Sequence, residues 1–326
     1  TDSGHLEYYT GTHWADVIVN NQDLGGGTGS NTGTGTRGLF IGGFSPSPLN
    51  AVHNVIQYVT ISTLGDAQDF GDLTAVSAAP AGVASRTRGI KAGGAPDNII
   101  NFVTISSTGD ATDYGDLVTS TRDQGAAGNE TRGIFAAGHG PINVIQYLTI
   151  ASTGDSVDFG DTSSTRDDLC RSQVNSAVRG VFAGGYASPA GINIMEFVTI
   201  SSTGNSQDFG DLTIARGRTS GVCNSTRGVF NGGQTGSGTG SNVIDFITIA
   251  TTGNATDFGD STVANIRNTG GCSSQTRGVF GGGYTPTYLN LIEFVTISET
   301  GNAVDFGDLL FLNTFGTGIS NGHGGL

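Results

Sequence analysis

Apolar and polar residues alternate along short segments of this chain, and these segments recur in a fixed order. In NVIDFITIA (residues 242–250) the alternation has a period of two, which is typical of a β-strand. A small-residue stretch, SGVCNS (220–225), and an apolar stretch, TRGVFNGG (226–233), precede it. A Thr-Gly-Asn turn and TDFGDSTV (256–263) follow it, and Gly and Asn are residues that tolerate the positive φ of hairpin turns. The pattern therefore predicts a unit of four short strands.

The same unit occurs six times. Each copy has an Arg-Gly, an apolar pair and a cluster of small residues, followed by a strand that ends in Thr-Ile and by an Asp-aromatic-Gly-Asp. The motif arginines are Arg37, Arg88, Arg132, Arg179, Arg227 and Arg277, at spacings of 51, 44, 47, 48 and 50 residues. Repeats of this length in strand-rich units predict an all-β fold, a six-bladed β-propeller with four-stranded blades.

The four strands of a unit differ in side-chain size, which predicts their radial order. The first strand consists of Gly, Ala, Ser, Asn and Cys, so we expect it to lie innermost, around the crowded axis. The second strand carries a Phe that we expect to pack between blades, except in the second copy, where Lys91 takes its place. The fourth strand, with one aromatic residue per copy, is expected outermost.

Closure of the ring is predicted from the C-terminal segment. GTGISN (316–321) resembles one more innermost strand, and we expect it to complete the first blade. The rival segment, residues 25–33, is rich in Gly and is interpreted as a linker. A seven-bladed alternative would pair LEYY and HWADV with the C-terminal strand, but it lacks a second strand. We therefore divide the chain into residues 1–33, a β-hairpin extension with a Gly-rich linker, and residues 34–326, the propeller.

Composition narrows the classes of function. The net charge is −14, with 14 Lys+Arg against 28 Asp+Glu, and Lys91 is the only lysine. Such an acidic chain offers no polybasic face for nucleic acid or an anionic membrane, and no apolar run predicts membrane insertion. The three cysteines have no metal-ligand spacing and are interpreted as small apolar residues of the core.

The order of signals resembles the Kelch repeat: an arginine after the fourth strand, a small-residue strand, an apolar strand ending in Gly-Gly, and an aromatic strand. The run LTIARGRTSGVCNSTRGVFNGG (212–233) carries this resemblance, which extends over the six copies. The arginines that match the early Kelch arginine are Arg122, Arg166, Arg216 and Arg267. The chain departs from the family at the fourth-strand tryptophan, which is Phe or Tyr here. The resemblance implies a propeller, and one alternative function is a Kelch-type protein-interaction scaffold.

The regular Gly/Thr/Ser-rich repeats are also similar to tandem-repeat virion proteins of tailed phages, including those of marine cyanobacteria. The N-terminal LEYYTGTHWADVIVNN (6–21) is similar to a hairpin found in phage tail and tail-fibre proteins. This resemblance implies a virion or extracellular location and a structural protein that mediates host attachment. Its implied partners are other virion or assembly proteins, contacted through the N-terminal extension, and a host-surface receptor or glycan. It also implies a homo-oligomer within an assembly.

Repeated aspartates are the first candidates for chemistry. A catalytic pair needs one special environment, whereas six similar copies of Asp-aromatic-Gly-Asp favour a structural role. A Ca²⁺ site formed by Asp110, Asp113 and Asp116 stays open as a weaker alternative, although the spacing of a known calcium loop is missing. We expect no other cofactor. The histidines are scattered, so we predict a non-enzymatic protein, with a propeller hydrolase or oxidase as the less favoured alternative.

The loops between second and third strands vary from copy to copy and emerge on one face of a propeller, so this is where we expect binding. Aromatic rings in such loops stack on sugars or anchor protein partners. The candidate binding residues in these loops are Phe44, His53, His139, Tyr186, Tyr284 and Tyr288.

Overall fold

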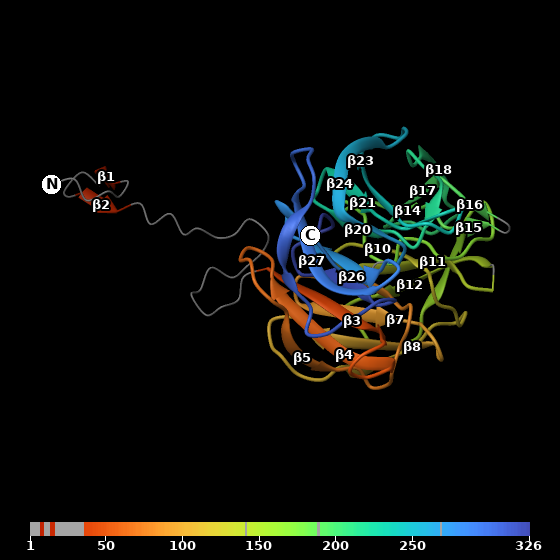
Figure 1. Cartoon of the computed structure of the whole chain (residues 1–326), viewed down its shortest axis with the longest axis horizontal. Coiled ribbons are helices and arrows are strands. Elements are labelled where there is room, and N and C mark those ends of the chain that lie inside the picture. The colour runs from red at the N-terminus through yellow and green to blue at the C-terminus, as the bar shows by residue number, and fades with distance from the viewer. Residues whose placement is uncertain (1–6, 10–13, 17–35, 141, 188–189, 268) are drawn as a thin grey trace.

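The protein folds into a ring of six antiparallel sheets, as the repeats predict. The computed structural model describes residues 7–9, 14–16, 36–140, 142–187, 190–267 and 269–326. Figure 1 shows the chain running around the ring, so that the first repeat (orange) and the last (blue) lie side by side. The described residues are all-β, and five of the six blades are four-stranded sheets.

Each blade is a meander whose strands we list by radial position. The inner strands are β29 (Thr317–Ser320), β6 (Ala81–Ala84), β10 (Gly125–Gly128), β20 (Ser220–Cys223) and β25 (Gly270–Ser273). The second strands are β3 (Arg37–Ser45), β7 (Arg88–Ala92), β11 (Arg132–Gly138), β14 (Arg179–Ala183), β21 (Arg227–Asn231) and β26 (Arg277–Tyr284). The third strands are β4 (Ala51–Thr60), β8 (Ile99–Thr104), β12 (Ile142–Thr149), β17 (Ile194–Thr199), β23 (Ser241–Thr248) and β27 (Tyr288–Thr296). The outer strands are β5 (Gln68–Asp72), β9 (Thr112–Asp116), β13 (Val157–Asp161), β18 (Gln207–Asp211), β24 (Thr256–Asn265) and β28 (Val304–Asp308). We number the blades one to six by their second strands, in chain order.

The C-terminal strand closes the ring in the predicted way. β29 pairs antiparallel with β3, from Thr317 opposite Ile41 to Ser320 opposite Gly38, and becomes the inner strand of blade one. The seven-bladed alternative is therefore wrong, because the C-terminal strand pairs with β3 and not with the N-terminal segment. Residues 321–325 continue beyond β29 as a buried tail.

The predicted N-terminal hairpin is present as the pair β1 (Glu7–Tyr9) and β2 (Trp14–Asp16). The predicted linker, residues 25–33, lies outside the described residues. Two further short pairs extend the blades at their loops: β15 (Tyr186–Ala187) with β16 (Ala190–Gly191), and β19 (Arg216–Gly217) with β22 (Gln234–Thr235).

Small residues at the axis allow the inner strands to approach one another closely. A Cβ atom on Gly270 of β25 would lie 2.2 Å from the backbone nitrogen of Gly318 in β29. Bulky side chains lie farther out, between blades: a Cβ on Gly125 of blade three would lie 2.9 Å from a ring carbon of Phe182 in blade four. The predicted radial order is thus confirmed, with small residues inside and aromatic residues between the sheets.

The motif arginines join each blade to the next. Every one of them donates from Nη1 to a backbone carbonyl at the end of the third strand of the following blade, at 2.9–3.0 Å. Each guanidinium also lies 4.1–4.7 Å from the ring centroid of an aromatic residue in its own third strand. Arg277 of blade six donates to Ile61 of blade one, so the circle of contacts is complete. The repeated Arg-Gly therefore has a structural role.

Blade four departs from the prediction of an innermost strand in SQVNSA (172–177). Its described sheet has three strands, β14, β17 and β18. Arg179 lies eleven positions after Asp168, whereas Arg132 of blade three lies nine positions after the corresponding Asp123. The two additional residues prevent a regular ladder, and only isolated bridges remain, such as Asn175 with Gly180. This segment lies across the axis, as described below.

Lys91 takes the place of the inter-blade Phe in blade two and is 3% exposed. Its Nζ donates to the Ile99 carbonyl at 3.3 Å and lies 3.9 Å from Oδ1 of Asp97. Burial lowers the pKa of Lys91 to about 8, and the Asp97 charge opposes that change. A depressed amine pKa means that the charged form destabilises the folded state.

The variant Lys91→Met is expected to raise the free energy of unfolding by about 1–3 kcal/mol near neutral pH, measured by urea denaturation. Between the folded pKa of about 8 and the ordinary value of 10.5, the unfolded wild type binds more protons, so its stability rises with pH. The advantage of the variant should therefore shrink across this window.

Arg86→Met, at a half-exposed ion pair with Glu130, is the control for loss of a positive charge. Its effect should stay within about 0.5 kcal/mol at every pH. A Lys91→Met effect that did not change with pH would contradict the assignment of a strained buried charge.

Candidate functional site

A segment of blade four crosses the axis of the ring. The carbonyl of Arg171 accepts from Gly82 N in blade two at 3.3 Å and from Thr317 Oγ1 in blade one at 2.9 Å. Ser172 Oγ accepts from Gly271 N in blade six at 2.9 Å. Gln173 forms an isolated β-bridge with Ala126 of blade three, and its carbonyl accepts a hydrogen bond from Cys223 Sγ of blade five. We call residues 170–173 the axial segment, and it contacts the five other blades.

The two ends of the axis differ. On the turn face, where first and second strands connect, the C-terminal tail covers the axis: His323 hydrogen-bonds through Nε2 with the Ala84 carbonyl at 2.8 Å and lies 3.2 Å from Asn175 Nδ2. Burial lowers the pKa of His323 to about 4. On the opposite loop face, which also carries the loops between second and third strands, the chain enters the axial part of blades one to five through a left-handed residue.

These left-handed residues place varied side chains around the axis. All five are residues other than glycine, with φ between 55° and 60°: Ala79, Asp123, Asp168, Arg218 and Phe315. A left-handed conformation costs a non-glycine residue about 1 kcal/mol. Strain of this kind at one place in a fold is a reason to look for function there.

Charged residues are grouped around the axis on the loop face, at and next to these left-handed residues. We call the group the axial arginine cluster, and its members are Arg122, Asp123, Asp168, Arg171, Arg218 and Arg267. Arg218 Nη2 lies 2.8 Å from Asp168 Oδ2, and Arg171 Nε lies 3.6 Å from Asp123 Oδ1. Arg122 Nε lies 3.5 Å from the other oxygen of Asp123. The cluster thus includes contacts among blades three, four and five.

Arg171 is the most buried arginine of the cluster, with a side chain that is 3% exposed. Its Nη1 and Nη2 atoms have no hydrogen-bond partner, although both are buried. The guanidinium carbon lies 5.5 Å from the ring centroid of Phe315, which is half-buried. Buried donors are almost always paired, so we expect a ligand to accept from Nη1 and Nη2, which we call the free edge of Arg171.

Like charges crowd the cluster. Burial lowers the pKa of Arg267, and the neighbouring Arg218 and Arg171 charges add to this, while Asp168 opposes it. Burial raises the pKa of Asp123 to about 6 against the opposing effect of Arg171. For Arg218, burial acts to lower the pKa, but its hydrogen bond and ion pair with Asp168 prevail and the pKa is raised. An added anion would relieve the repulsion among the arginines.

The arginines of this chain fall into distinct groups, and this cluster is one of them. Six are the motif arginines that join blades. Arg166 and Arg216 are fully buried in ion pairs with Glu196 and Asp245, and Arg86 pairs with Glu130 on the surface. The four arginines that remain all belong to the axial arginine cluster.

The expectation that Arg122, Arg166, Arg216 and Arg267 are equivalent is therefore wrong. Arg166 and Arg216 stand two residues before the left-handed residues Asp168 and Arg218 and point between strands, whereas Arg122 stands one residue before Asp123. Arg267 precedes its motif arginine by ten positions, as Arg122 does. That offset of one residue turns a structural arginine into a member of the cluster. Arg171 and Arg218 were not predicted as site residues from the sequence. Two features of the sequence could have indicated them: the two additional residues in copy four, and the arginines before the first strand that occur only in copies three to six.

Most of the predicted binding residues lie on the loop face around this cluster. Tyr284 and Tyr288 have ring centroids 4.9 Å apart, and Phe44 lies 5.9 Å from Tyr288. Arg267 of the cluster lies 5.7 Å from the Tyr284 ring. Blades one and six thus share an aromatic group, Phe44, Tyr284 and Tyr288, beside the arginines.

Two further predicted residues border the cluster on its other side. The Arg218 guanidinium lies 5.7 Å from the Tyr186 ring, and the Tyr186 hydroxyl donates to the Thr235 carbonyl at 3.0 Å. His139 is half-exposed, and its Nδ1 lies 3.6 Å from Asp167 Oδ2. The structure brings these residues to the rim of one site.

The placement of His53 in an exposed loop is wrong. It lies within β4, is 3% exposed and hydrogen-bonds through Nε2 with Asn313 Oδ1 at 3.0 Å. Its ring packs edge-on against Phe311, 5.0 Å away. Burial lowers the pKa of His53, although the Asn313 hydrogen bond opposes this. The long β3–β4 hairpin buries this side chain where a shorter one would expose it.

The repeated aspartates take part in blade-to-blade hydrogen bonds. Oδ1 of Asp110 accepts from the backbone N of Asp72 in the preceding blade at 3.0 Å, and Asp116 N donates to Asp155 Oδ1 at 2.9 Å. The other four blade junctions repeat this bond, with Asn or Asp as the acceptor. Across the described ranges, no three His, Cys, Asp or Glu side chains are grouped so that they could hold a metal ion. Calcium at Asp110, Asp113 and Asp116 stays a prediction.

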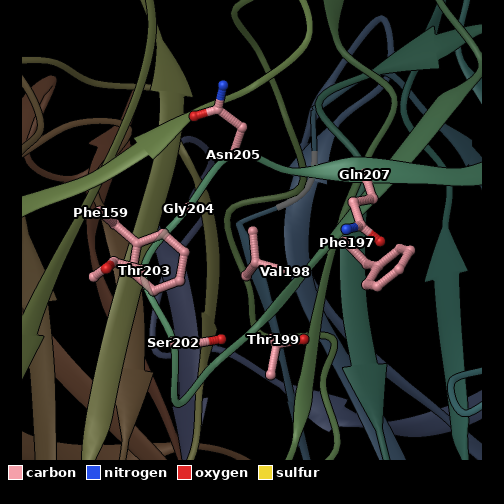
Figure 2. A pocket seen from close by; sticks show the side chains of 9 residues that line it. All are labelled: Phe159, Phe197, Val198, Thr199, Ser202, Thr203, Gly204, Asn205 and Gln207. Carbon is pink, nitrogen blue, oxygen red and sulfur yellow. The ribbon is translucent and has the colours of Figure 1, made fainter.

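Shallow clefts also recur on the turn face, where hairpins of adjacent blades meet. The one in Figure 2 has a volume of about 260 Å³ and lies between Phe159 of blade three and the hairpin of blade four, including Thr199, Ser202 and Gln207. Clefts of about 130–420 Å³ occupy corresponding positions at blades one, five and six. Because the repeat itself generates them, they do not mark a single specialised site.

Within the described part of the chain, no helix has the length and apolar character needed to cross a membrane. No protein-family model matches the sequence, and no curated protein matches it either.

Proposed function

We propose that this protein is a non-enzymatic recognition protein that binds its partner with the loop face of the propeller. The observation that carries the proposal is the gathering, on one face of a chain of net charge −14, of four arginines other than the six motif arginines that join each blade to the next. Aromatic side chains border these arginines on two sides. Arginine and aromatic residues are the side chains that most often dominate binding surfaces.

The biological setting within this proposal is a virion or extracellular structural protein that attaches to a host surface. The regular Gly/Thr/Ser-rich repeats and the N-terminal similarity to tail-fibre proteins of tailed phages support it. In this setting the hairpin β1–β2 and its neighbouring residues would join the propeller to an assembly, and the loop face would be displayed. A glycan is the favoured surface ligand, since aromatic rings and arginines suit sugars that carry a negative charge.

A glycan array probed with the full-length protein, and with Tyr288→Ala and Leu64→Ala variants, tests this function. Tyr288 belongs to the aromatic group on the loop face, whereas Leu64 is 60% exposed in a hairpin turn of the opposite face. We expect glycan binding by the wild type that falls at least about tenfold in Tyr288→Ala, as for an interface hot spot. Leu64→Ala should bind like the wild type.

Two results would overturn the proposal. One is the absence of binding to any glycan, neutral or acidic, at any salt concentration. The other is binding that Leu64→Ala weakens and Tyr288→Ala does not, since the turn face would then be the binding surface. Capture of a protein partner by the loop face in the absence of glycan binding would favour the Kelch-type scaffold instead.

A further inference from the structure

We propose that the axial arginine cluster binds the carboxylate of an acidic sugar, and that the free edge of Arg171 is the group that holds it. This inference rests on the proposed function and names the ligand class that its loop face recognises. It identifies a specific position at the axis, distinct from the aromatic group formed by Phe44, Tyr284 and Tyr288.

The backbone of Arg171 is fixed, so its side chain is preorganised. Its carbonyl accepts from two other blades, and Nε is directed to Asp123 at 3.6 Å. Nη1 and Nη2 remain as a parallel pair of donors without partners. A carboxylate accepts from two such donors at once, which is the geometry that distinguishes arginine from lysine in anion recognition. The unsatisfied edge therefore matches one carboxylate.

The local charge also favours an anion at this point. The cluster and the adjoining Asp167 contain four arginines and three aspartates, an excess of positive charge in an acidic protein. Arg267 is repelled by Arg218 and Arg171. A bound carboxylate would be attracted to all three, and the burial of Arg171 would strengthen that attraction.

The neighbours of Arg171 select a ligand that also carries hydroxyl groups. Oδ1 of Asp123 is buried, has no hydrogen-bond partner and lies beside the Arg171 guanidinium, so it can accept from a hydroxyl. Phe315 and Tyr186 are half-buried rings next to the arginines, and such rings pack against the C–H face of a sugar. A peptide with several carboxylates would instead meet Asp123, Asp168 and the net charge of the protein. A sugar with a single carboxylate per ring satisfies both sets of groups.

Calorimetric titration of the full-length protein with tri-galacturonate tests the assignment. The matched ligands are its methyl ester, which lacks the charge, acetate, which lacks the hydroxyls, and an oligo-glutamate peptide. We expect tri-galacturonate to bind and each of the other three to bind at least about tenfold more weakly. The variants are Arg171→Lys, expected to weaken binding about tenfold, and Arg171→Met, expected to abolish it.

Thermal melting shows whether the variants fold. Arg171→Met should still unfold in a single cooperative transition, because it removes buried donors that lack partners while Asp123 keeps its contact with Arg122. Arg86→Met, on the turn face, serves as the matched arginine control and should bind tri-galacturonate like the wild type. Binding that survives in a folded Arg171→Met variant would overturn the inference.

The ligand comparisons can overturn it as well. Equal binding of the methyl ester would exclude recognition of the carboxylate, and equal binding of acetate would leave a simple anion site. Tighter, Arg171-dependent binding of the glutamate peptide would assign the site to a protein partner. If tri-galacturonate fails while Tyr288→Ala still abolishes binding on the glycan array, this inference falls and the proposed function stands.

Discussion

Removal of residues 317–326 is expected to leave the chain without cooperative folding at room temperature. The deletion takes away β29, which pairs with β3 along its length and lies at the axis of the ring. Ile319 is 1% exposed and packs with Leu39 and with residues of blade two. Loss of one such side chain costs about 2–5 kcal/mol, and the deletion also leaves the inner edge of β3 unpaired. A typical domain has only about 5–15 kcal/mol of stability, so the sum exceeds what the ring can lose.

Circular dichroism during heating, together with size-exclusion chromatography, measures this outcome. Removal of residues 321–326 alone keeps β29 and takes away only the tail that carries His323, so it should reduce the melting temperature and preserve a single transition. Removal of residues 1–33 should leave the melting temperature of the propeller unchanged, in agreement with the predicted domain boundary. A 317–326 deletion that melts cooperatively near the wild-type temperature would show that the C-terminal strand does not close the ring.

The architecture could be predicted because it follows from repeated local patterns. Each copy carries the same sequence of small, apolar, alternating and aromatic strands, and each strand has to bury the same face. The closing strand could also be predicted, since GTGISN has the small residues of an inner strand and no apolar second strand follows it to form another blade. Spacing and side-chain size were sufficient for these features, because neither depends on long-range detail.

The site could be predicted only at its rim. Tyr186 and Tyr284 were found because variable loops on one face are the usual place for binding. Arg171 was missed because two additional residues between Asp168 and Arg179 could bulge toward solvent as readily as toward the axis. Contacts of the axial segment with Gly82, Gly271 and Thr317 decide between these directions, and those residues come from other blades.

His53 shows the opposite limitation. Its position just after a Gly-Gly and a proline-containing stretch predicts a loop, yet the β3–β4 ladder continues to Ser45 and Ala51 and buries the ring. Hairpin length varies among the blades, as the short β7 and the long β3 illustrate. Packing against Asn313 and Phe311, at the far end of the chain, determines where this side chain lies.

The variant Asp245→Ala is expected to reduce the free energy of unfolding by about 3–5 kcal/mol, the effect of leaving a buried charge without its partner. Asp245 and Arg216 are both 0% exposed, and Oδ2 of the aspartate lies 2.8 Å from Nη2 of the arginine. Arg216 also donates to the Val243 carbonyl at 2.6 Å, so it cannot turn to solvent when the carboxylate is removed. Urea denaturation near neutral pH measures the loss.

The double variant Arg216→Met/Asp245→Leu separates the contribution of the two charges to stability from the contribution of the packing of the two side chains. Replacing both charges with apolar side chains of similar size removes the uncompensated guanidinium, so most of the lost stability should return. Glu130→Ala breaks the half-exposed pair with Arg86 and should cost less than about 1 kcal/mol. If Asp245→Ala cost no more than Glu130→Ala, the buried arginine would have another way to satisfy its charge. Recovery of stability in the double variant would instead show that the loss in Asp245→Ala comes from the buried Arg216 charge that is left without a partner. This is the result expected for two ionic groups enclosed between strands of one blade.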